Sequence, residues 1–390
     1  MSTSTSTDQA NAPARPMMLS DYLRKHELGL NLLRLVLALL VIFSHAFPLG
    51  GWGPDPLWPT GTPATSYGGF AVGGFFALSG MLVTMSGMRS SVERFLKSRF
   101  LRLVPAYFVV IVLTAAVLAP IIYVLSNHTF AGYFSFSTQG PVMYVIKNLQ
   151  FPFTLQFGID NIFLTTTPYG RETGLSVING SLWTIPIEIR CYLIALLVVL
   201  LGKIFGVTRT ALVALAGIAF LIVVGHVRPE TAVVVAPEWL PYSHQAYELV
   251  FVFLCGAAFG SVARRLPMNK VVAITAVAAF AITSVLGGAW FRTIGLGSLA
   301  IVLPLVAALL PSSRLGVFRN DLSYGTYLWA FPIQQTLAFL GIAAIHWLFL
   351  GGSVVLTLVL AGLSWKLIEQ PSLRLKKKRL RVGRPRTAPL

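Results

Sequence analysis

Long apolar stretches separated by short polar segments are the dominant pattern of this chain. A hydrophobic run of about 18 or more residues can cross a bilayer as a helix. The pattern therefore predicts an all-α, polytopic integral membrane protein with about ten transmembrane helices. The apolar stretches lie at 30–49, 67–88, 103–125, 183–202, 210–226, 245–262, 270–289, 294–311, 323–344 and 347–369.

The segments that join these stretches are alternately rich and poor in lysine and arginine. These residues are concentrated in every second connection and scarce in the others. Because basic residues collect on the cytoplasmic side of membrane proteins, both termini are expected to be cytoplasmic. The basic connections are 24–25, 89–102, 203–209, 264–270, 314–319 and 374–386, and the scarce ones hold Lys147, Arg171, Arg228 and Arg292.

The same pattern divides the chain into three regions. Residues 1–26 are expected to form a disordered cytoplasmic tail, 27–371 a membrane domain, and 372–390 a basic cytoplasmic tail. A basic tail next to a membrane helix is expected to bind anionic lipid headgroups.

Composition excludes several classes of protein. The 390 residues are 55% hydrophobic and 11% charged, with a mean hydropathy of +0.75, which excludes an ordinary soluble enzyme. The net charge of +17 is spread over connections and the last residues, so it predicts topology and not nucleic-acid binding. No His-Glu-x-x-His or Cys-x-x-Cys spacing occurs, so no metal site is expected, and Cys191 and Cys255 lie in apolar stretches without a predicted disulfide.

The first apolar stretch carries two ionisable groups, Arg34 and His45. Eleven helical residues return to nearly the same azimuth, so both side chains share one face, about 16 Å apart along the axis. Arg34 should lie near the cytoplasmic face and His45 near the outer face. Ionisable groups inside a membrane usually face a bundle interior or a wet cavity, which predicts a functional site. The alternative is that Arg34 extends to a lipid headgroup and His45 caps a neighbouring helix.

The second stretch, GGFAVGGFFALSG, has small residues three and four positions apart. This spacing is typical either of close helix packing or of a substrate tunnel lined by Gly73, Gly74 and Ser79. The basic segment RSSVERFLKSRFLRLVPAY follows and places Arg99 and Arg102 on one helix face. These arginines are either a topology signal or a site for a phosphorylated ligand.

Two later segments add candidate residues. SLWTIPIEIRCYL contains Glu188, which we expect at the depth of His45, where it could orient the imidazole, or alternatively pair with Arg190. DLSYGTYLWAFPIQQT places Tyr324 and Tyr327 on one helix face, with Asp321 or Ser323 as the helix cap.

The order of these motifs resembles that of the membrane-bound acyltransferase family 3, over residues 30–371. The resemblance implies a bacterial inner-membrane O-acyltransferase that transfers an acyl group, commonly acetyl from acetyl-CoA, to sugars of surface polysaccharide, lipopolysaccharide or lipo-oligosaccharide. The family's activity is tied to an arginine and a histidine of the first span, which correspond to Arg34 and His45. Ala330 departs from the family, which often has histidine at this position. The motifs are the Arg34 and His45 pair, GGFFALSG, FLKSRFLRLVPAY, SLWTIPIEIRCYL, DLSYGTYLWAFPI and IEQPS.

We therefore expect an O-acyltransferase without a permanently bound cofactor, in which His45 is the general base and Glu188 orients it. An acyl-histidine or acyl-Ser79 relay remains an alternative. The expected donor-binding residues are Arg34, Arg99, Arg102, Gly73, Gly74 and Ser79, and the expected acceptor-binding residues are Trp183, Tyr324 and Tyr327.

The competing hypothesis is a secondary transporter that exports a glycan precursor or acyl compound, with Arg34 and Glu188 as binding charges. The sequence contains no inverted repeat and no matched pair of broken spans, which argues against a carrier.

Overall fold

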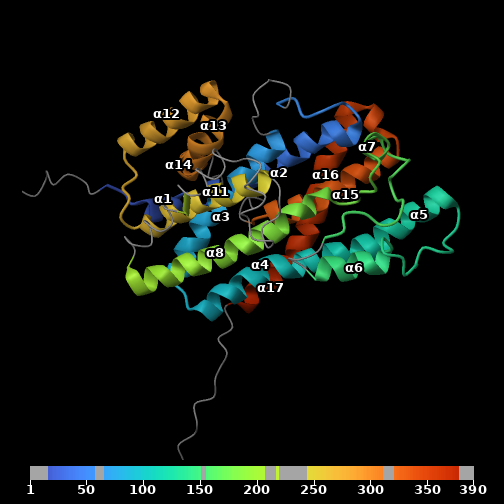
Figure 1. The fold of residues 1–390 in the computed structure, drawn as a ribbon, viewed down its shortest axis with the longest axis horizontal. Coiled ribbons are helices and arrows are strands. Elements are labelled where there is room, and N and C mark those ends of the chain that lie inside the picture. The colour runs from blue at the N-terminus through green and yellow to red at the C-terminus, as the bar shows by residue number, and fades with distance from the viewer. Residues whose placement is uncertain are drawn as a thin grey trace, which may run out of the picture.

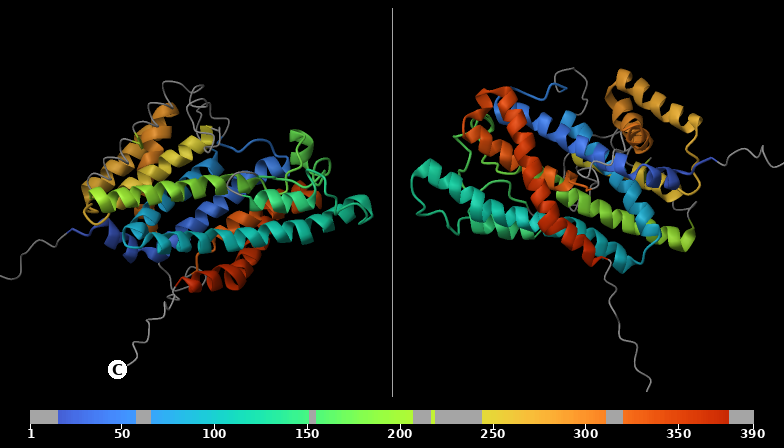
Figure 2. Two further views of the ribbon diagram at one scale, coloured as in Figure 1. Left: turned by 60° about the horizontal axis from the view of Figure 1, so that its bottom comes forward. Right: turned by 180° about the vertical axis from the view of Figure 1, so that it is seen from behind.

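The computed structural model describes residues 16–57, 66–150, 155–206, 217–218, 244–310 and 320–376. Over these residues the chain forms helices joined by short connections, with one isolated β-bridge between Met18 and Pro267. The predicted all-α class is confirmed. The helices form one elongated bundle, with α12 (Lys270–Leu286) and α14 (Leu296–Leu309) at one edge and α5 (Ala119–Asn127) and α6 (Pro141–Leu149) at the opposite end (Figures 1 and 2).

The remaining elements follow the apolar pattern closely. The N-terminal half contains α1 (Leu19–Lys25), α2 (Glu27–Gly50), α3 (Tyr67–Met88), α4 (Val92–Leu113), the π-helical segment η1 (Thr114–Leu118), α7 (Pro168–Thr173), the 3-10 helix η2 (Gly180–Trp183) and α8 (Thr184–Phe205). The C-terminal half contains α11 (His244–Val262), α13 (Gly288–Trp290), η3 (Phe291–Gly295), α15 (Ser323–Phe339), η5 (Ile342–Ala344), α16 (His346–Ser364), η6 (Trp365–Glu369) and α17 (Gln370–Leu375).

Six helical segments in the described chain are long and apolar enough to cross a membrane, and two more are apolar but shorter. The protein is therefore a membrane protein. The predicted stretch 210–226 falls almost wholly outside the described residues. The long segments are Glu27–Gly50, Tyr67–Met88, Val92–Asn127, Gly180–Phe205, Phe291–Leu309 and His346–Leu375, and the shorter ones are Ala246–Val262 and Lys270–Leu286.

Three predicted boundaries are corrected. The expected disordered tail over 1–26 contains α1, because Leu19 and Leu23 are buried and the Leu19 amide donates to the Leu266 carbonyl over 2.9 Å. The stretch 323–344 is helical only to Phe339, because Gly341 adopts a left-handed φ of 77° that ends the helix. The last stretch, expected to end at 369, stays helical to Leu375, with Pro371 inside the continuous helical segment His346–Leu375.

The glycine stripe of α3 serves close packing against α11. A Cβ atom at Gly80 would lie 2.0 Å from the Phe253 carbonyl oxygen, and one at Gly256 would lie 2.1 Å from the Ala77 carbonyl oxygen. These backbones can approach only because neither glycine has a side chain.

Helices α2, α4 and α15 run in the same direction, as the charge alternation predicts. Arg34 meets Asp321 at one end of the α2–α15 pair, and the Gln334 amide donates to the Ile42 carbonyl further along. Arg102 of α4 meets the same Asp321, and α4 continues through η1 into α5 at the far end of the bundle (Figure 1). We call the end at Arg34, Arg102 and Asp321 the basic end, and the opposite end the His45 end.

Helices α3 and α8 run in the opposite direction. Gly74 packs on Leu37 while Gly68 packs on Ser44, so α3 descends along α2 toward the basic end. Likewise, Gly180 packs on Phe331 and Thr184 meets Tyr327, so α8 descends along α15.

Candidate active site

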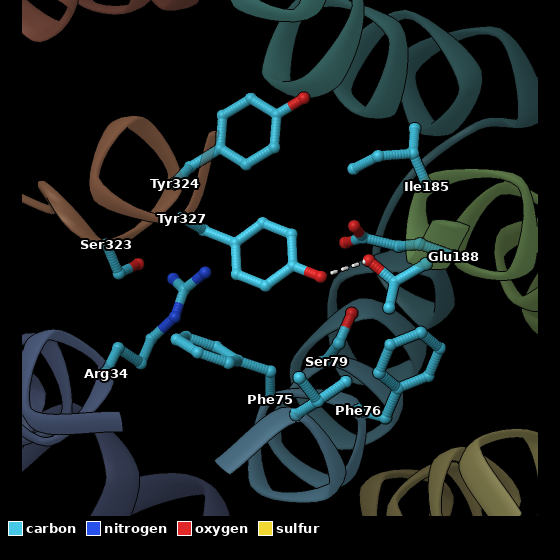
Figure 3. Close-up of a pocket in the computed structure, with 11 residues that line it drawn as sticks. Arg34, Phe75, Phe76, Ser79, Ile185, Glu188, Ser323, Tyr324 and Tyr327 are labelled. Carbon is cyan, nitrogen blue, oxygen red and sulfur yellow. Dashed lines mark hydrogen bonds between the residues drawn. The ribbon is translucent and has the colours of Figure 1, made fainter. Parts of the chain in front are cut away.

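A cavity of about 60 Å³ lies between α2, α3, α8 and α15, toward the basic end. It brings together five predicted site residues from four helices, as Figure 3 shows. Val72, Phe75, Phe76 and Ile185 add apolar surface, so the cavity joins charged and hydroxyl groups to a largely apolar wall. The five predicted residues are Arg34, Ser79, Glu188, Tyr324 and Tyr327.

Asp321 holds the two arginines of the basic end side by side. Its Oδ2 accepts hydrogen bonds from Arg34 Nη1 and, over 2.5 Å, from Arg102 Nη2. Its Oδ1 accepts from the Ser323 amide over 3.2 Å and from the Ser323 hydroxyl over 2.5 Å, so it also satisfies the first N–H of α15, although the N-cap residue itself is Leu322. Glu369 Oε2 lies 4.0 Å from Arg102 Nη1 as a second acid.

Asp321 remains ionised because of these neighbours. Burial alone would raise the pKa of its carboxyl, but the charges of Arg102 and Arg34 and the hydrogen bonds from Ser323 hold it well below the usual range. The sequence predicted Asp321 only as a helix cap. The sequence also contained a signal for an ion pair, because an acid at the basic end of an apolar helix needs a cationic partner.

Arg99 reaches the cavity indirectly. Its Nε donates to the Ser98 hydroxyl over 3.2 Å, and its guanidinium lies 5.6 Å from the ring centroid of Tyr192. The Tyr192 hydroxyl in turn donates to Glu188. The three predicted arginines therefore converge on the basic end, although Arg99 does not line the cavity.

The two tyrosines of α15 tie that helix to its neighbours. The Tyr324 hydroxyl donates to the Leu103 carbonyl over 2.9 Å. The Tyr327 hydroxyl donates to the Ser181 carbonyl over 2.9 Å and lies 2.7 Å from the Thr184 hydroxyl. Both rings face the cavity, whereas Trp183, predicted beside them, packs partly buried against the core and does not line it.

The predicted glycines lie elsewhere. A Cβ atom at Gly74 would contact Leu37 at 3.1 Å, so Gly74 packs α3 on α2, and one at Gly73 would contact nothing within 4 Å. Neither glycine lines the cavity, but Ser79 does. No histidine of the described chain is among its lining residues, so Ser79 has no imidazole base beside it.

His45 lies apart from this cavity, nearer the other end of α2. Its ring packs edge to face on Phe331, with centroids 5.4 Å apart. Its Nδ1 is buried and has no hydrogen-bond partner among the described residues. The preceding Ser44 donates to Asp55 over 2.5 Å, and Asp55 accepts from the Tyr67 amide over 3.0 Å, which fixes the chain beside His45.

The expectation that Glu188 orients His45 is wrong. His45 and Gly180 both pack on Phe331, which places them at one level, while Glu188 lies eight residues further toward the basic end. At 1.5 Å per residue that separates the levels by about 12 Å. The sequence-based prediction placed both residues by counting from the outer ends of their apolar stretches, and it assumed that these ends lie at the same depth in the membrane. Instead the segment before α8 folds into the bundle, where the Asn179 amide donates to the Leu328 carbonyl over 3.0 Å.

Ala330, where the resemblance expects histidine, is fully buried one residue before Phe331. The imidazole of His45 therefore packs against an aromatic ring of α15, next to a position that supplies no second imidazole.

The family model described as an acyltransferase domain matches residues 27–366. The chain belongs to the acyltransferase 3 family. This acyltransferase is 29% identical over 353 residues to an O-acetyl transferase of Shigella phage Sf6, covering 86% of the present chain and 93% of the relative. It is also 29% identical over 365 residues to nodulation protein 10 of Rhizobium leguminosarum bv. viciae. That match covers 90% of the present chain and 94% of the relative. No solved structure is significantly similar to it.

Family membership and the apolar helices together identify the protein as a membrane-bound acyltransferase. The enzyme hypothesis is thereby confirmed over the transporter hypothesis.

Proposed function

We propose that this O-acyltransferase, a multi-pass protein of the bacterial inner membrane, transfers an acetyl group from acetyl-CoA to a sugar hydroxyl of a cell-surface polysaccharide, lipopolysaccharide or lipo-oligosaccharide. The name of the Shigella phage relative, O-acetyl transferase, supports acetyl as the acyl group. The chemistry of CoA and the arrangement of α2 support the donor, and the family resemblance supports a surface glycan as the acceptor.

The observation that carries this proposal is that one helix bears both an arginine at the basic end and a histidine near the other end. Arg34 and His45 lie about 16 Å apart along α2. CoA is a polyanion made in the cytoplasm, and arginine binds phosphate oxygens through two parallel hydrogen bonds. The nucleotide of the donor would bind at the basic end, and its long pantetheine arm would carry the thioester toward His45.

Asp321 preorganises this donor site. Arg34 and Arg102 each use one terminal nitrogen to bond Asp321. A guanidinium has five N–H donors, so each arginine keeps others for a phosphate. Arg99 would add a third positive charge, and Glu188, bonded by Tyr192 beneath Arg99, would belong to the donor end and not to the base.

The cavity must widen when the donor binds. A volume of about 60 Å³ holds only a few water molecules, which is less than a pantetheine arm requires. Phe75 and Phe76 form part of its apolar wall, so we propose that these side chains move aside as the arm enters.

At the His45 end the proposed chemistry is direct transfer. A neutral imidazole accepts the proton of the sugar hydroxyl while the hydroxyl oxygen attacks the thioester carbonyl carbon. The carbon–sulfur bond then breaks, and the thiolate of CoA leaves and takes up the proton from the imidazole. The unpartnered Nδ1 of His45 is consistent with this role, because no described residue competes for it.

A purified preparation in detergent tests the proposal. With acetyl-CoA and an oligosaccharide of the cell's own surface polysaccharide, released by mild acid, the enzyme should release free CoA and add one acetyl group to the sugar, read out by mass spectrometry. Neither product should form without the oligosaccharide. CoA release without a sugar ester would show a hydrolase, and no release with any acyl-CoA would contradict the proposed donor.

A further inference from the structure

A second cavity, of about 450 Å³, opens at the His45 end. It lies between the end of α2, α7 and the connection from α15 to α16, and we call it the Trp52 pocket. The residues that line it include Trp52, Thr166, Pro168, Arg171, Gly341 and His346. Pockets for small ligands typically measure about 300–1,000 Å³, so this one has room for one or two sugar rings.

The aromatic wall of the pocket is rigid. The indole Nε1 of Trp52 donates to the Ala343 carbonyl over 3.0 Å, and the indole ring packs edge to face on His346, with centroids 4.2 Å apart. A Cβ atom at Gly50 would lie 2.7 Å from this indole, so only glycine there lets Trp52 fold over the end of α2. Because its N–H is already bonded, Trp52 offers an apolar ring surface, which suits the C–H face of a sugar.

The opposite wall supplies hydrogen-bonding groups. Arg171 is exposed, and its Nη1 makes one long hydrogen bond of 3.4 Å to the Thr165 carbonyl. A guanidinium has five N–H donors, so others remain available to a ligand. His346 is exposed at the start of α16. The Thr166 hydroxyl has no hydrogen-bond partner in the part of the chain that the structure describes. Such groups match sugar hydroxyls and carboxylates.

Packed aromatic rings lie between the pocket and His45. His45 contacts Phe331, whose ring centroid lies 6.1 Å from that of Tyr169, and the neighbouring Pro168 lines the pocket. Gly50, also in the lining, follows His45 by five residues, or about 7.5 Å of helix. A pocket at about that distance from His45 could hold the sugar unit next to the one that reacts.

We propose that the Trp52 pocket binds a sugar unit of the acceptor glycan next to the unit whose hydroxyl is acylated. Trp52 would pack on the ring face, while Arg171 and His346 would bond its hydroxyl or acidic groups. The inference rests on the proposed function and adds an acceptor subsite formed by residues that the sequence did not single out. It predicts that the enzyme prefers oligosaccharides over single sugars.

The test compares Arg171→Ala and His346→Ala with the unchanged enzyme. The acceptors are a four- to six-sugar fragment of the cell's surface polysaccharide, released by mild acid, and its component monosaccharides. Losing a charged hydrogen bond should raise KM for the fragment about tenfold. KM for acetyl-CoA and kcat/KM for the monosaccharides should stay unchanged. Lys147→Ala is the matched control, since Lys147 is a partly buried basic residue of the same segment that does not line the pocket.

Equilibrium binding of the same fragment without acetyl-CoA separates the two proposals. If the enzyme acylates the fragment and both variants keep its KM, the pocket proposal is wrong and the proposed function stands. If the enzyme binds the fragment but does not acylate it, and Arg171→Ala weakens binding about tenfold, the subsite stands and the acceptor of the reaction is different. If the fragment neither binds nor reacts, both proposals are overturned.

Discussion

His45→Ala is expected to lower kcat for acyl transfer by about 10²–10⁴-fold, the usual contribution of a general base. The imidazole is partly buried and has an unpartnered Nδ1 among the described residues, so its removal breaks no described hydrogen bond. The variant should therefore accumulate in the membrane at a normal level. Initial rates of CoA release, normalised to the purified enzyme, provide the measurement.

His128→Asn is the control for His45→Ala. His128 is exposed and has a φ of 55°, a conformation that asparagine tolerates, so this change removes an imidazole without altering the bundle. It should leave the rate unchanged. Activity within about threefold of wild type in His45→Ala would exclude the general-base role, because base loss costs far more.

Asp321→Asn is expected to lower the free energy of unfolding by about 3–5 kcal/mol, the usual cost of removing one partner from a buried ion pair. The Asp321 side chain is 12% exposed and bonds Arg34 and Arg102. Its loss would leave Arg34 without this partner and Arg102 with only Glu369, 4.0 Å away. KM for acetyl-CoA should also rise, because the arginines lose their common anchor. Denaturant unfolding in mixed micelles and donor kinetics measure the two effects.

Asp21→Asn is the matched control, because it breaks an Asp–Arg pair whose side chains are 48% and 72% exposed. Such a surface pair contributes about 0–1 kcal/mol. Equal losses in the two variants would contradict the anchoring role of Asp321. Because its folded pKa is depressed, the Asp321 contribution should be present above about pH 4 and be lost as the pH falls below that value.

The sequence predicted what depends on local pattern. Apolar length predicted the helices, and the eleven-residue spacing on α2 predicted that Arg34 and His45 share a helix. Alternating charge predicted that α2, α4 and α15 run in the same direction, because each basic connection marks the same side of the membrane.

What the sequence did not predict depends on contacts between distant segments. Asp321 meets Arg34 across 287 positions, and no local pattern encodes that pairing. The levels of His45 and Glu188 depend on how deeply the segment before α8 enters the bundle, which hydropathy does not report. Trp52, Arg171 and His346 lie far apart in sequence, so their common pocket emerges only from the fold.

The central claim is that one enzyme joins a donor at the basic end to an acceptor at the His45 end. Sealed membrane vesicles of known orientation test it most directly. With radiolabelled acetyl-CoA facing the basic end and the oligosaccharide enclosed on the opposite side, we predict label on the enclosed sugar. Reversing the vesicle orientation should abolish labelling until detergent opens the membrane. Labelling that requires donor and acceptor on the same side would contradict this account.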